Sequence, residues 1–399
     1  MLIRKISAFL HATFHTQTVG SNLKKLLYIL ALLIVPVNIN AQIDSLISRL
    51  SFEADFRFRI EQDWDSKKSD GSFREDRTRL RYRLRAGATY KGKWYEVGFR
   101  IRTGNPIKQQ DPQLTLGDGN KEFSTLPIGI EKAYFQGKWK TFIFWLGKNN
   151  FPFEKNNELF WSDNVYPEGV TIENNFNTNS NIIDNINLKG GHYIIATSNK
   201  SFDKDSYFQG FQISTSFFDK RISLFPSFYY FKNIPDIPDG NDNFYINYSI
   251  LHIGTKFKIL KDIPLYSEFD YYKNLQDYTG NDSIPNNLKN QKSGLVFGLK
   301  YGKLKNKKDW MFSTSYTKLQ KFSAVDFLAQ NDWARWDYSS SGSPDGRLTN
   351  FNGIELVAGY KISGKISLKM KYYFVEQLIP LTSNKENGSR IRLDLDVKF

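Results

Sequence analysis

The sequence predicts an all-β protein, a transmembrane antiparallel up-and-down β-barrel of about 16 strands. Three observations predict it. Many segments alternate apolar and charged side chains, short and long connections between them alternate along the chain, and the last segment ends in Phe399. A strand presents alternate side chains to opposite faces, so each segment lies between an apolar and an aqueous medium. In a membrane barrel these media are lipid and a water-filled lumen.

The alternation is clearest early in the chain. The segment "FEADFRFRI" at 52–60 sets phenylalanines against Glu, Asp and Arg, and "RTRLRYRLRAGATY" at 77–90 sets five arginines against apolar residues. No long segment shows a period of about 3.6 residues, so helices are not expected. We expect strands near residues 52–63, 76–90, 93–103, 130–137, 140–148, 167–175, 185–197, 206–218, 221–232, 246–258, 263–275, 291–303, 308–320, 350–362, 365–377 and 389–399.

The connections indicate a barrel rather than a sandwich. Alternate ones are long and polar, at 104–129, 149–166, 276–290 and 321–349. The others are mostly tight, at 91–93, 137–139, 219–220, 260–262, 305–308 and 363–365. Outer-membrane barrels sort their connections in this way, with short periplasmic turns and long external loops. An even number of strands then places both ends of the barrel in the periplasm.

The closing segment has a lipid face and a wet face. Its apolar residues Leu393, Leu395, Val397 and Phe399 alternate with charged ones. We expect this strand to close the barrel against the first strand. It also resembles the C-terminal signal that the barrel assembly machinery reads, so that machinery and outer-membrane lipid are the expected partners.

The N-terminal residues predict export. Lys24 and Lys25 precede an apolar run over 26–37, and a polar stretch follows that ends in Ala41. A run of this length is too short to cross a bilayer core of ~30 Å as a helix. We therefore expect residues 1–41 to be a signal peptide that is removed, 42–50 to be a short periplasmic segment, and 51–399 to be the barrel. The expected location is the outer membrane of a Gram-negative bacterium.

Composition excludes several classes of protein. The chain contains no cysteine, which rules out disulfides, thiolate metal sites, cysteine nucleophiles and a lipoprotein anchor. Its net charge is +14, but no recognition-helix pattern or separate basic domain accompanies it, so nucleic acid is not an expected partner.

Catalysis and metal binding are not expected either. Only His192 and His252 follow the predicted signal peptide, and no nucleophile motif appears, so the sequence does not predict an enzyme. The acidic loops at 63–71 and 236–243 do not fit the spaced ligands of a calcium loop. We expect no metal and no cofactor.

The region from about 76 to 175 resembles a known group, the putative porins of Gram-negative outer membranes, which are best represented in the Bacteroidota. The matching stretches are "RTRLRYRLRAG", "GFRIRTGNP", "EKAYFQ", "LGKNNFPF" and "LFWSDNVYPEG". The resemblance implies a barrel channel through which small hydrophilic solutes pass. Many relatives carry a coiled-coil-like stretch before the barrel, whereas here only "QIDSLISRL" separates the predicted signal peptide from the first strand. Assembly through such a stretch is therefore not implied, and whether the protein forms a homo-oligomer stays open.

Arginines dominate the wet face of the first three expected strands. We expect nine to line the pore, namely Arg57, Arg59, Arg77, Arg79, Arg81, Arg83, Arg85, Arg100 and Arg102. Only four acids, Glu53, Asp55, Glu61 and Glu96, share these faces, which leaves a surplus of about five positive charges. The sequence therefore predicts an anion-preferring pore. The alternative is a structural network in which acids neutralise the arginines.

The segment 149–167 is the third external loop on this count. It is a candidate constriction loop that folds inward, with Glu154, Glu158, Asp163 and the following Glu168 facing the arginines. The alternative is an ordered external loop packed by its own aromatic residues.

Three functions fit these patterns. The first is an outer-membrane porin for passive diffusion of small hydrophilic, anionic solutes. The second is a substrate-specific or exporter barrel for anionic saccharides, similar to alginate-export barrels. The third is a closed barrel that serves as an adhesin or structural protein.

Overall fold

The computed structural model describes residues 48–110, 112–117, 123, 125–178, 180–198, 201–236, 244–330, 332–333, 349–380 and 383–399. One compact unit begins at Leu50 and runs to Phe399. The expected signal peptide lies outside the described residues, as do most of the expected periplasmic segment and of the acidic loop at 236–243.

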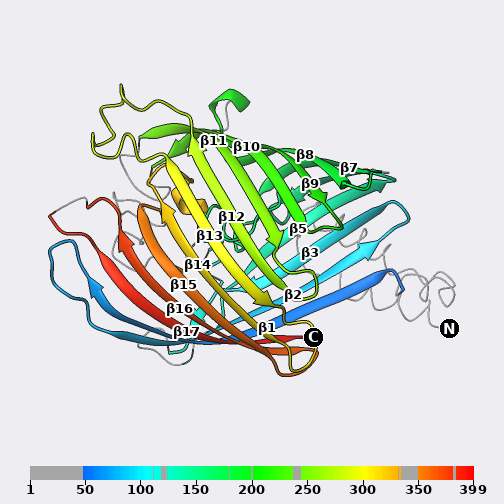
Figure 1. Ribbon diagram of the computed structural model, residues 1–399, viewed down its shortest axis with the longest axis horizontal. Helices are drawn as coiled ribbons and strands as arrows, with labels where there is room; N and C mark the ends of the chain where they lie inside the picture. The colour runs from blue at the N-terminus through cyan, green and yellow to red at the C-terminus, as the bar shows by residue number, and fades with distance from the viewer. Residues whose placement is uncertain are drawn as a thin grey trace, which may run out of the picture. The chain divides into compact units, whose positions relative to one another are not determined.

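Sixteen long strands and one two-residue strand form a single closed antiparallel sheet (Figure 1). Each long strand pairs with the next along the chain, and β1 also pairs with the last strand, which closes the ring. The predicted fold class is confirmed. The strands are β1 (Leu50–Lys67), β2 (Arg77–Lys91), β3 (Tyr95–Thr103), β4 (Leu114–Thr115), β5 (Ile128–Trp139), β6 (Phe142–Lys148), β7 (Glu168–Asn177), β8 (Ile183–Ala196), β9 (Ser206–Phe217), β10 (Ile222–Pro235), β11 (Tyr245–Lys258), β12 (Leu265–Asn274), β13 (Ser293–Gly302), β14 (Trp310–Leu319), β15 (Phe351–Lys361), β16 (Ile366–Gln377) and β17 (Asn387–Lys398).

Alternation along the strands gives the barrel two faces. In β2, Leu80 and Leu84 are 42 % and 44 % exposed, whereas Arg83 between them is 4 % exposed. Aromatic and aliphatic side chains on the other strands are exposed in the same way, for example Phe269 and Phe297. The apolar face is the outer one, because packed loop residues cover the opposite face. This is the arrangement that lipid outside and water inside require.

The connections alternate in length as the sequence predicts. Short turns join β2 to β3, β5 to β6, β9 to β10, β13 to β14 and β15 to β16, while long loops join the strands at the other end. One turn differs from the expectation: β5 continues to Trp139, so the turn falls at 140–141 rather than 137–139. Lys140 has φ 50°, and this left-handed residue reverses the chain within two residues.

The loop between β3 and β5 contains the short strand β4. Its residues Leu114 and Thr115 pair with Tyr82 and Arg81, so β4 continues the ladder where β3 has ended. The short helices η1 (Phe202–Lys204) and η2 (Asp326–Leu328) lie in two other loops. In the ranges that the structure describes, no helix has the length and apolar character needed to cross a membrane.

The closing strand β17 has a neighbour on each side. Leu395 lies opposite Phe58 of β1 and Leu368 of β16, and Phe399 donates its backbone N–H to Ala54 at 2.9 Å. The first and last residues of the barrel therefore both lie on the side that carries the short turns, because Leu50 also pairs with Tyr90 beside the turn after β2.

Replacing Leu393, Leu395 and Val397 together with Asp should block assembly of the barrel in the outer membrane. A charged side chain on the lipid face costs up to about 2–4 kcal/mol for Lys or Arg and less for Asp, and three such costs fall on the strand that closes the ring. The measurement is the amount of folded protein in isolated outer membranes.

The matched control places three Asp residues at Ser283, Asn286 and Asn287, which are exposed in a long loop. This control should assemble normally. Normal assembly of the β17 variant would show that its apolar face does not meet lipid.

Candidate functional site

The loop 149–167 between β6 and β7 folds into the barrel. Its residues Phe153, Phe160 and Trp161 are at most 3 % exposed. Phe160 stacks on Tyr229 of β10 and Tyr272 of β12, with ring centroids 4.8 and 5.0 Å apart. Residues that point to the opposite face of these strands include Phe228 and Phe269, which are exposed. The loop therefore packs on the inner wall from β8 to β12.

Polar contacts hold the tip of this loop against the wall. The Asn156 amide donates to the Thr255 carbonyl at 2.9 Å and to an Asp270 carboxylate oxygen at 3.1 Å. Asn157 donates to the same Asp270 oxygen at 2.7 Å. The other Asp270 oxygen lies 2.9 Å from Nε2 of His252, and both residues are buried. Hydrogen bonds to a charged acceptor contribute more than neutral ones, so this cluster fixes the position of the loop.

Two further loops interlock with the first. The Ser162 N–H donates to the Leu328 carbonyl at 2.9 Å, which ties loop 149–167 to the loop between β14 and β15. The Gln110 amide, from the loop after β3, donates to the Phe327 and Ala329 carbonyls at 2.7 Å. The buried aromatic and aliphatic residues of loop 149–167 and of the loop between β14 and β15 form one cluster with the inner walls of the surrounding strands. The loops thus fill part of the interior.

The arginines of β1 make ion pairs across the closure of the barrel. Arg57 Nε lies 2.5 Å from Asp396, and Arg59 Nε lies 2.6 Å from Asp394. Each arginine also donates a second bond to its partner carboxylate at 3.1 Å, so both pairs are bidentate. A bidentate pair is specific in its geometry as well as strong.

The arginines of β2 form a ladder of pairs along β1. Arg83 and Arg85 bind the two oxygens of Asp55 at 2.9 and 2.8 Å. Arg77 lies 2.9 Å from Asp63, and Arg79 and Arg81 lie by Glu61. These positions are set by register. Arg77, Arg79 and Arg85 lie directly opposite their acids in the β1–β2 pairing, whereas Arg81 and Arg83 lie opposite arginines of β1 and reach their acids diagonally.

One arginine missed by the count from the sequence completes this ladder. Arg390 of β17 is 1 % exposed and lies 2.6 Å from Asp63 and 3.1 Å from Glu61. Its neighbour Arg392 pairs with Asp332 of the loop between β14 and β15. Both arginines belong to the charged face of the closing segment, and that alternation was the signal for them.

Arg100 and Arg102 of β3 have different surroundings. Arg100 lies 2.5 Å from Glu131 and donates to the Tyr166 hydroxyl of loop 149–167 at 2.7 Å. Arg102 donates to the backbone carbonyls of Thr103, Asn105 and Lys108. Arg102 thus orders the start of the loop after β3.

The acids on this wall differ from the four expected. Glu96 accepts a hydrogen bond from Tyr134 instead of pairing with an arginine. Within the described residues, ten arginines of β1, β2, β3 and β17 pair with eight carboxylates, and Arg102 binds backbone carbonyls. The eleven arginines therefore exceed the paired carboxylates by three, and by two when Glu96 is counted, rather than by about five. The carboxylates are Glu53, Asp55, Glu61, Asp63, Glu131, Asp332, Asp394 and Asp396.

A cavity of about 510 Å³ lies between loop 149–167 and the inner walls of β12 to β16. Its strand wall is lined in part by small residues, Gly298, Ser313 and Ser315, and carries the ammonium groups of Lys369 and Lys371. Short side chains leave this part of the interior open, and the mixture of hydroxyls and charges makes it hydrophilic.

The four expected constriction acids divide into two pairs. Glu158 and Asp163 line the cavity, and Asp163 lies 2.5 Å from Lys155. Glu154 is exposed, and its backbone N–H donates a hydrogen bond to the Gln212 side chain. Glu168 begins β7 and pairs with Lys148. Of these four acids, only Glu158 and Asp163 therefore line the cavity.

The pKa of Glu158 is raised from its ordinary value. Burial against the loop and wall is the main cause, and the nearby carboxylates of Asp163 and Asp332 add to it, while Lys371 and Lys155 oppose it. In the case of Asp332, burial acts in the same direction, but Arg392 and Arg59 outweigh it and hold its pKa well below the usual range.

Comparisons with known proteins agree with this geometry. Residues 71–249 match the sequence profile of a family described as "Putative porin". No curated protein matches the chain by sequence. Among solved structures, a high-pH structure of OprB from Pseudomonas putida has a TM-score of 0.54 at 11 % identity, over 90 % of this chain and 96 % of that one.

OmpF from Salmonella typhi, solved in a complex with daunomycin, has a TM-score of 0.53 at 11 % identity, over 88 % of this chain and 97 % of that one. At this identity the likeness establishes the fold alone. Residues 71–249 are thus similar to the putative porin family, and the chain has the barrel fold of outer-membrane porins.

Proposed function

We propose that this protein is an outer-membrane porin through which small hydrophilic, preferentially anionic, solutes diffuse passively. The observation that carries the proposal is the hydrophilic cavity beside loop 149–167, inside a barrel whose adjoining wall of β17 and β1 to β3 carries more arginines than carboxylates. The match of residues 71–249 to the putative porin family supports it. The barrel assembly machinery and outer-membrane lipid are the partners that such a protein requires.

The path runs between the loop and the inner faces of β13, β14 and β15. Gly298, Ser313 and Ser315 have short side chains there, so a solute can approach the wall closely. Serine hydroxyls both donate and accept hydrogen bonds, and can replace part of the water that a sugar or small acid loses in a narrow pore.

The preference for anions follows from the composition of the wall. A guanidinium group does not lose its proton at physiological pH, so a surplus of arginines over carboxylates is a permanent positive charge. Walls of low dielectric focus this field into the lumen and raise the local concentration of anions. The arginines act through their net charge, since most of them are held in ion pairs.

A closed barrel is the second candidate. The interlocked loops favour it, because Phe160, Trp161 and Leu328 are buried in one cluster within the interior. An exporter for anionic saccharides would use the same positive wall. A measurement of conductance distinguishes an open pore from a closed barrel. A comparison of the transport of an anionic saccharide with that of simple salts distinguishes an exporter from a porin.

The purified protein in planar bilayers under a salt gradient should show stepwise conductance with a zero-current potential on the anion side. Replacing Arg77, Arg79 and Arg81 together with Gln should remove the surplus and move this potential toward zero. The fold should persist, because Glu61 and Asp63 keep Arg390 as their partner.

The control is Arg221→Gln, which removes a positive charge that is exposed at the turn before β10. It should leave the potential unchanged. The shift in the triple variant should shrink at about 1 M salt, where the Debye length is about 3 Å. Absence of conductance would favour the closed barrel, and an unchanged potential would show that the arginines do not set ion preference.

Acidification should strengthen the preference for anions through Glu158. Because the pKa of this carboxyl is raised, it takes up a proton at a higher pH than an ordinary glutamate and so loses its negative charge first. The zero-current potential should move further to the anion side, with a midpoint above that of an ordinary glutamate. Asp332 keeps its charge over this range because its pKa is lowered.

The variant Glu158→Gln should show at neutral pH the stronger anion preference of the acidified protein and should lack this titration. Glu154→Gln, in the exposed part of the same loop, should titrate as the unmodified protein does. An identical titration in Glu158→Gln would assign the effect to another group.

A further inference from the structure

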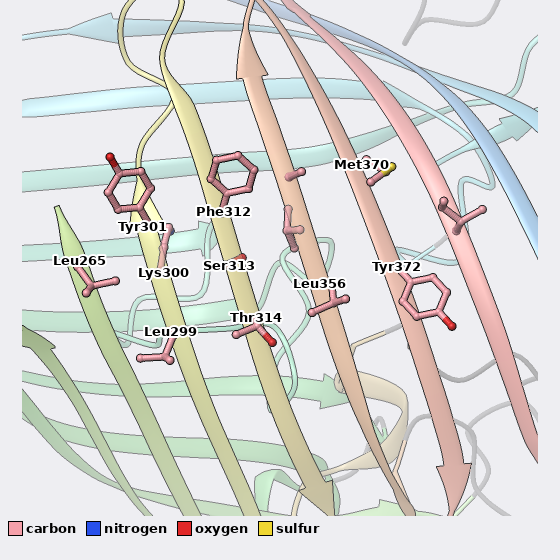
Figure 2. Close-up of a pocket in the computed structure, with 13 residues that line it drawn as sticks. Leu265, Leu299, Lys300, Tyr301, Phe312, Ser313, Thr314, Leu356, Met370 and Tyr372 are labelled. Carbon is pink, nitrogen blue, oxygen red and sulfur yellow. The ribbon is translucent and has the colours of Figure 1, made fainter. Parts of the chain in front are cut away.

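A hollow of about 650 Å³ lies on the outer face of the barrel, across the strands from β12 to β17 (Figure 2). Its lining is almost wholly apolar. Figure 2 shows Leu299, Phe312, Leu356, Met370 and Tyr372 on four adjacent strands around it. This hollow belongs to the face opposite the solute path, so the proposed function does not explain it.

Two small residues create the hollow. Thr314 stands between Leu299 of β13 and Leu356 of β15, and Ala358 stands between Phe312 of β14 and Met370 of β16. The neighbours on each side are large, so the small pair leaves a depression between them. A depression with walls of this kind can hold a flexible hydrocarbon chain in van der Waals contact on several sides.

An aromatic rim marks the level of the membrane surface beside the hollow. Trp310 is 53 % exposed, and its ring lies 5.7 Å from that of Phe312 and 4.7 Å from that of Tyr360. Tryptophan and tyrosine gather where the hydrocarbon meets the head groups. Trp310 is the first residue of β14, directly after the short turn from β13, so this rim lies on the short-turn side of the hollow.

The short turn between β13 and β14 is strongly basic. Its residues 305–309, "KNKKD", carry Lys305, Lys307 and Lys308, all exposed. The acid of this turn, Asp309, accepts hydrogen bonds from the backbone N–H groups of Lys305 and Asn306 at 3.0 and 2.6 Å. In the part of the chain that the structure describes, none of the three ammonium groups forms an ion pair.

We propose that this hollow and the lysines of the adjacent turn form a binding site for one anionic phospholipid of the periplasmic leaflet. An acyl chain lies over Thr314 and Ala358, and the phosphate lies beside the ammonium groups of Lys305, Lys307 and Lys308. The proposal rests on the outer-membrane location of the barrel and does not require that the pore conducts.

The placement of the lysines determines the class of lipid. Short turns face the periplasm in bacterial barrels, and both ends of this chain's barrel lie on the same side. The lipid within reach of these lysines is therefore a phospholipid. Its preferred head group is anionic, because ammonium groups near a membrane surface attract negative lipids.

A second copy of the chain fits the site less well. A two-fold contact places the same patch of each copy against the other, so two turns that carry three exposed lysines each would lie close together. Like charges in such a contact repel, whereas a phosphate group neutralises them.

Native mass spectrometry of the purified protein with equal amounts of dioleoyl phosphatidylglycerol and dioleoyl phosphatidylethanolamine tests the site. The unmodified protein should retain one phosphatidylglycerol in preference to phosphatidylethanolamine. The Lys305→Gln, Lys307→Gln, Lys308→Gln variant should lose this preference by about tenfold or more. Ala358→Phe, which fills the hollow, should lower the retention of both lipids.

The matched control is Lys91→Gln, Lys93→Gln, Lys140→Gln, which removes three exposed lysines from the turns after β2 and β5. It should retain phosphatidylglycerol as the unmodified protein does. A resistance to heat on gels verifies that each variant is folded. Equal loss in the control, or no loss in the turn and hollow variants, would overturn the proposal. So would a homo-oligomer of the unmodified protein that Ala358→Phe dissociates.

Discussion

The closure of the sheet between β1 and β17 is the constraint on which the rest of the structure depends. A hydrocarbon environment offers no hydrogen-bond partners, so an open strand edge is not viable there. Backbone pairing from Asp55 with Lys398 to Lys67 with Asn387 removes both edges at once. The same seam is joined on the inner side by the pairs of Arg57 with Asp396 and Arg59 with Asp394. Closure therefore fixes both the lipid face and the position of the charged wall.

Once the ring is closed, its two interior sides are used differently. Around β8 to β12 the inner side chains are aromatic, and loop 149–167 packs on them as a second layer. Around β1 to β3 the wall is charged and the guanidinium groups are ordered by carboxylates. Breaking one pair in such a network leaves a buried charge without its partner, which costs far more than the pair itself contributes. The network thus holds the wall rigid while its net charge stays positive.

Much of the fold could be predicted from the sequence, because a barrel strand carries its own signal. The alternation in "RTRLRYRLRAG" and in the last segment is local, and so is the contrast between tight turns and long loops. The boundaries were less exact where a turn depends on one backbone angle, as at Lys140.

The site was predicted only in part. The nine arginines stand on the expected strands, and three of the expected acids, Glu53, Asp55 and Glu61, pair with them. Asp394 and Asp396 were not expected as partners, since they reach β1 only after the ring closes across more than three hundred residues. Glu158 was a candidate residue of loop 149–167, but Asp332 comes from a loop whose inward path no local pattern shows. Gly298 and Ser315 leave the cavity open because their side chains are small, and small residues give no signal in a sequence.

The central claim is that solutes pass beside loop 149–167, along the inner faces of β13 to β15. The chain contains no cysteine, so a single cysteine can be placed at will. Ser315 lines the cavity, so Ser315→Cys places a thiol there. Phe312 lies on the same strand but is 46 % exposed on the outer face, so Phe312→Cys places a thiol toward lipid. A charged methanethiosulfonate reagent should lower the current through Ser315→Cys and leave Phe312→Cys unchanged. Modification of Ser315→Cys without any change of current would contradict the claim, because the solute path would then lie elsewhere.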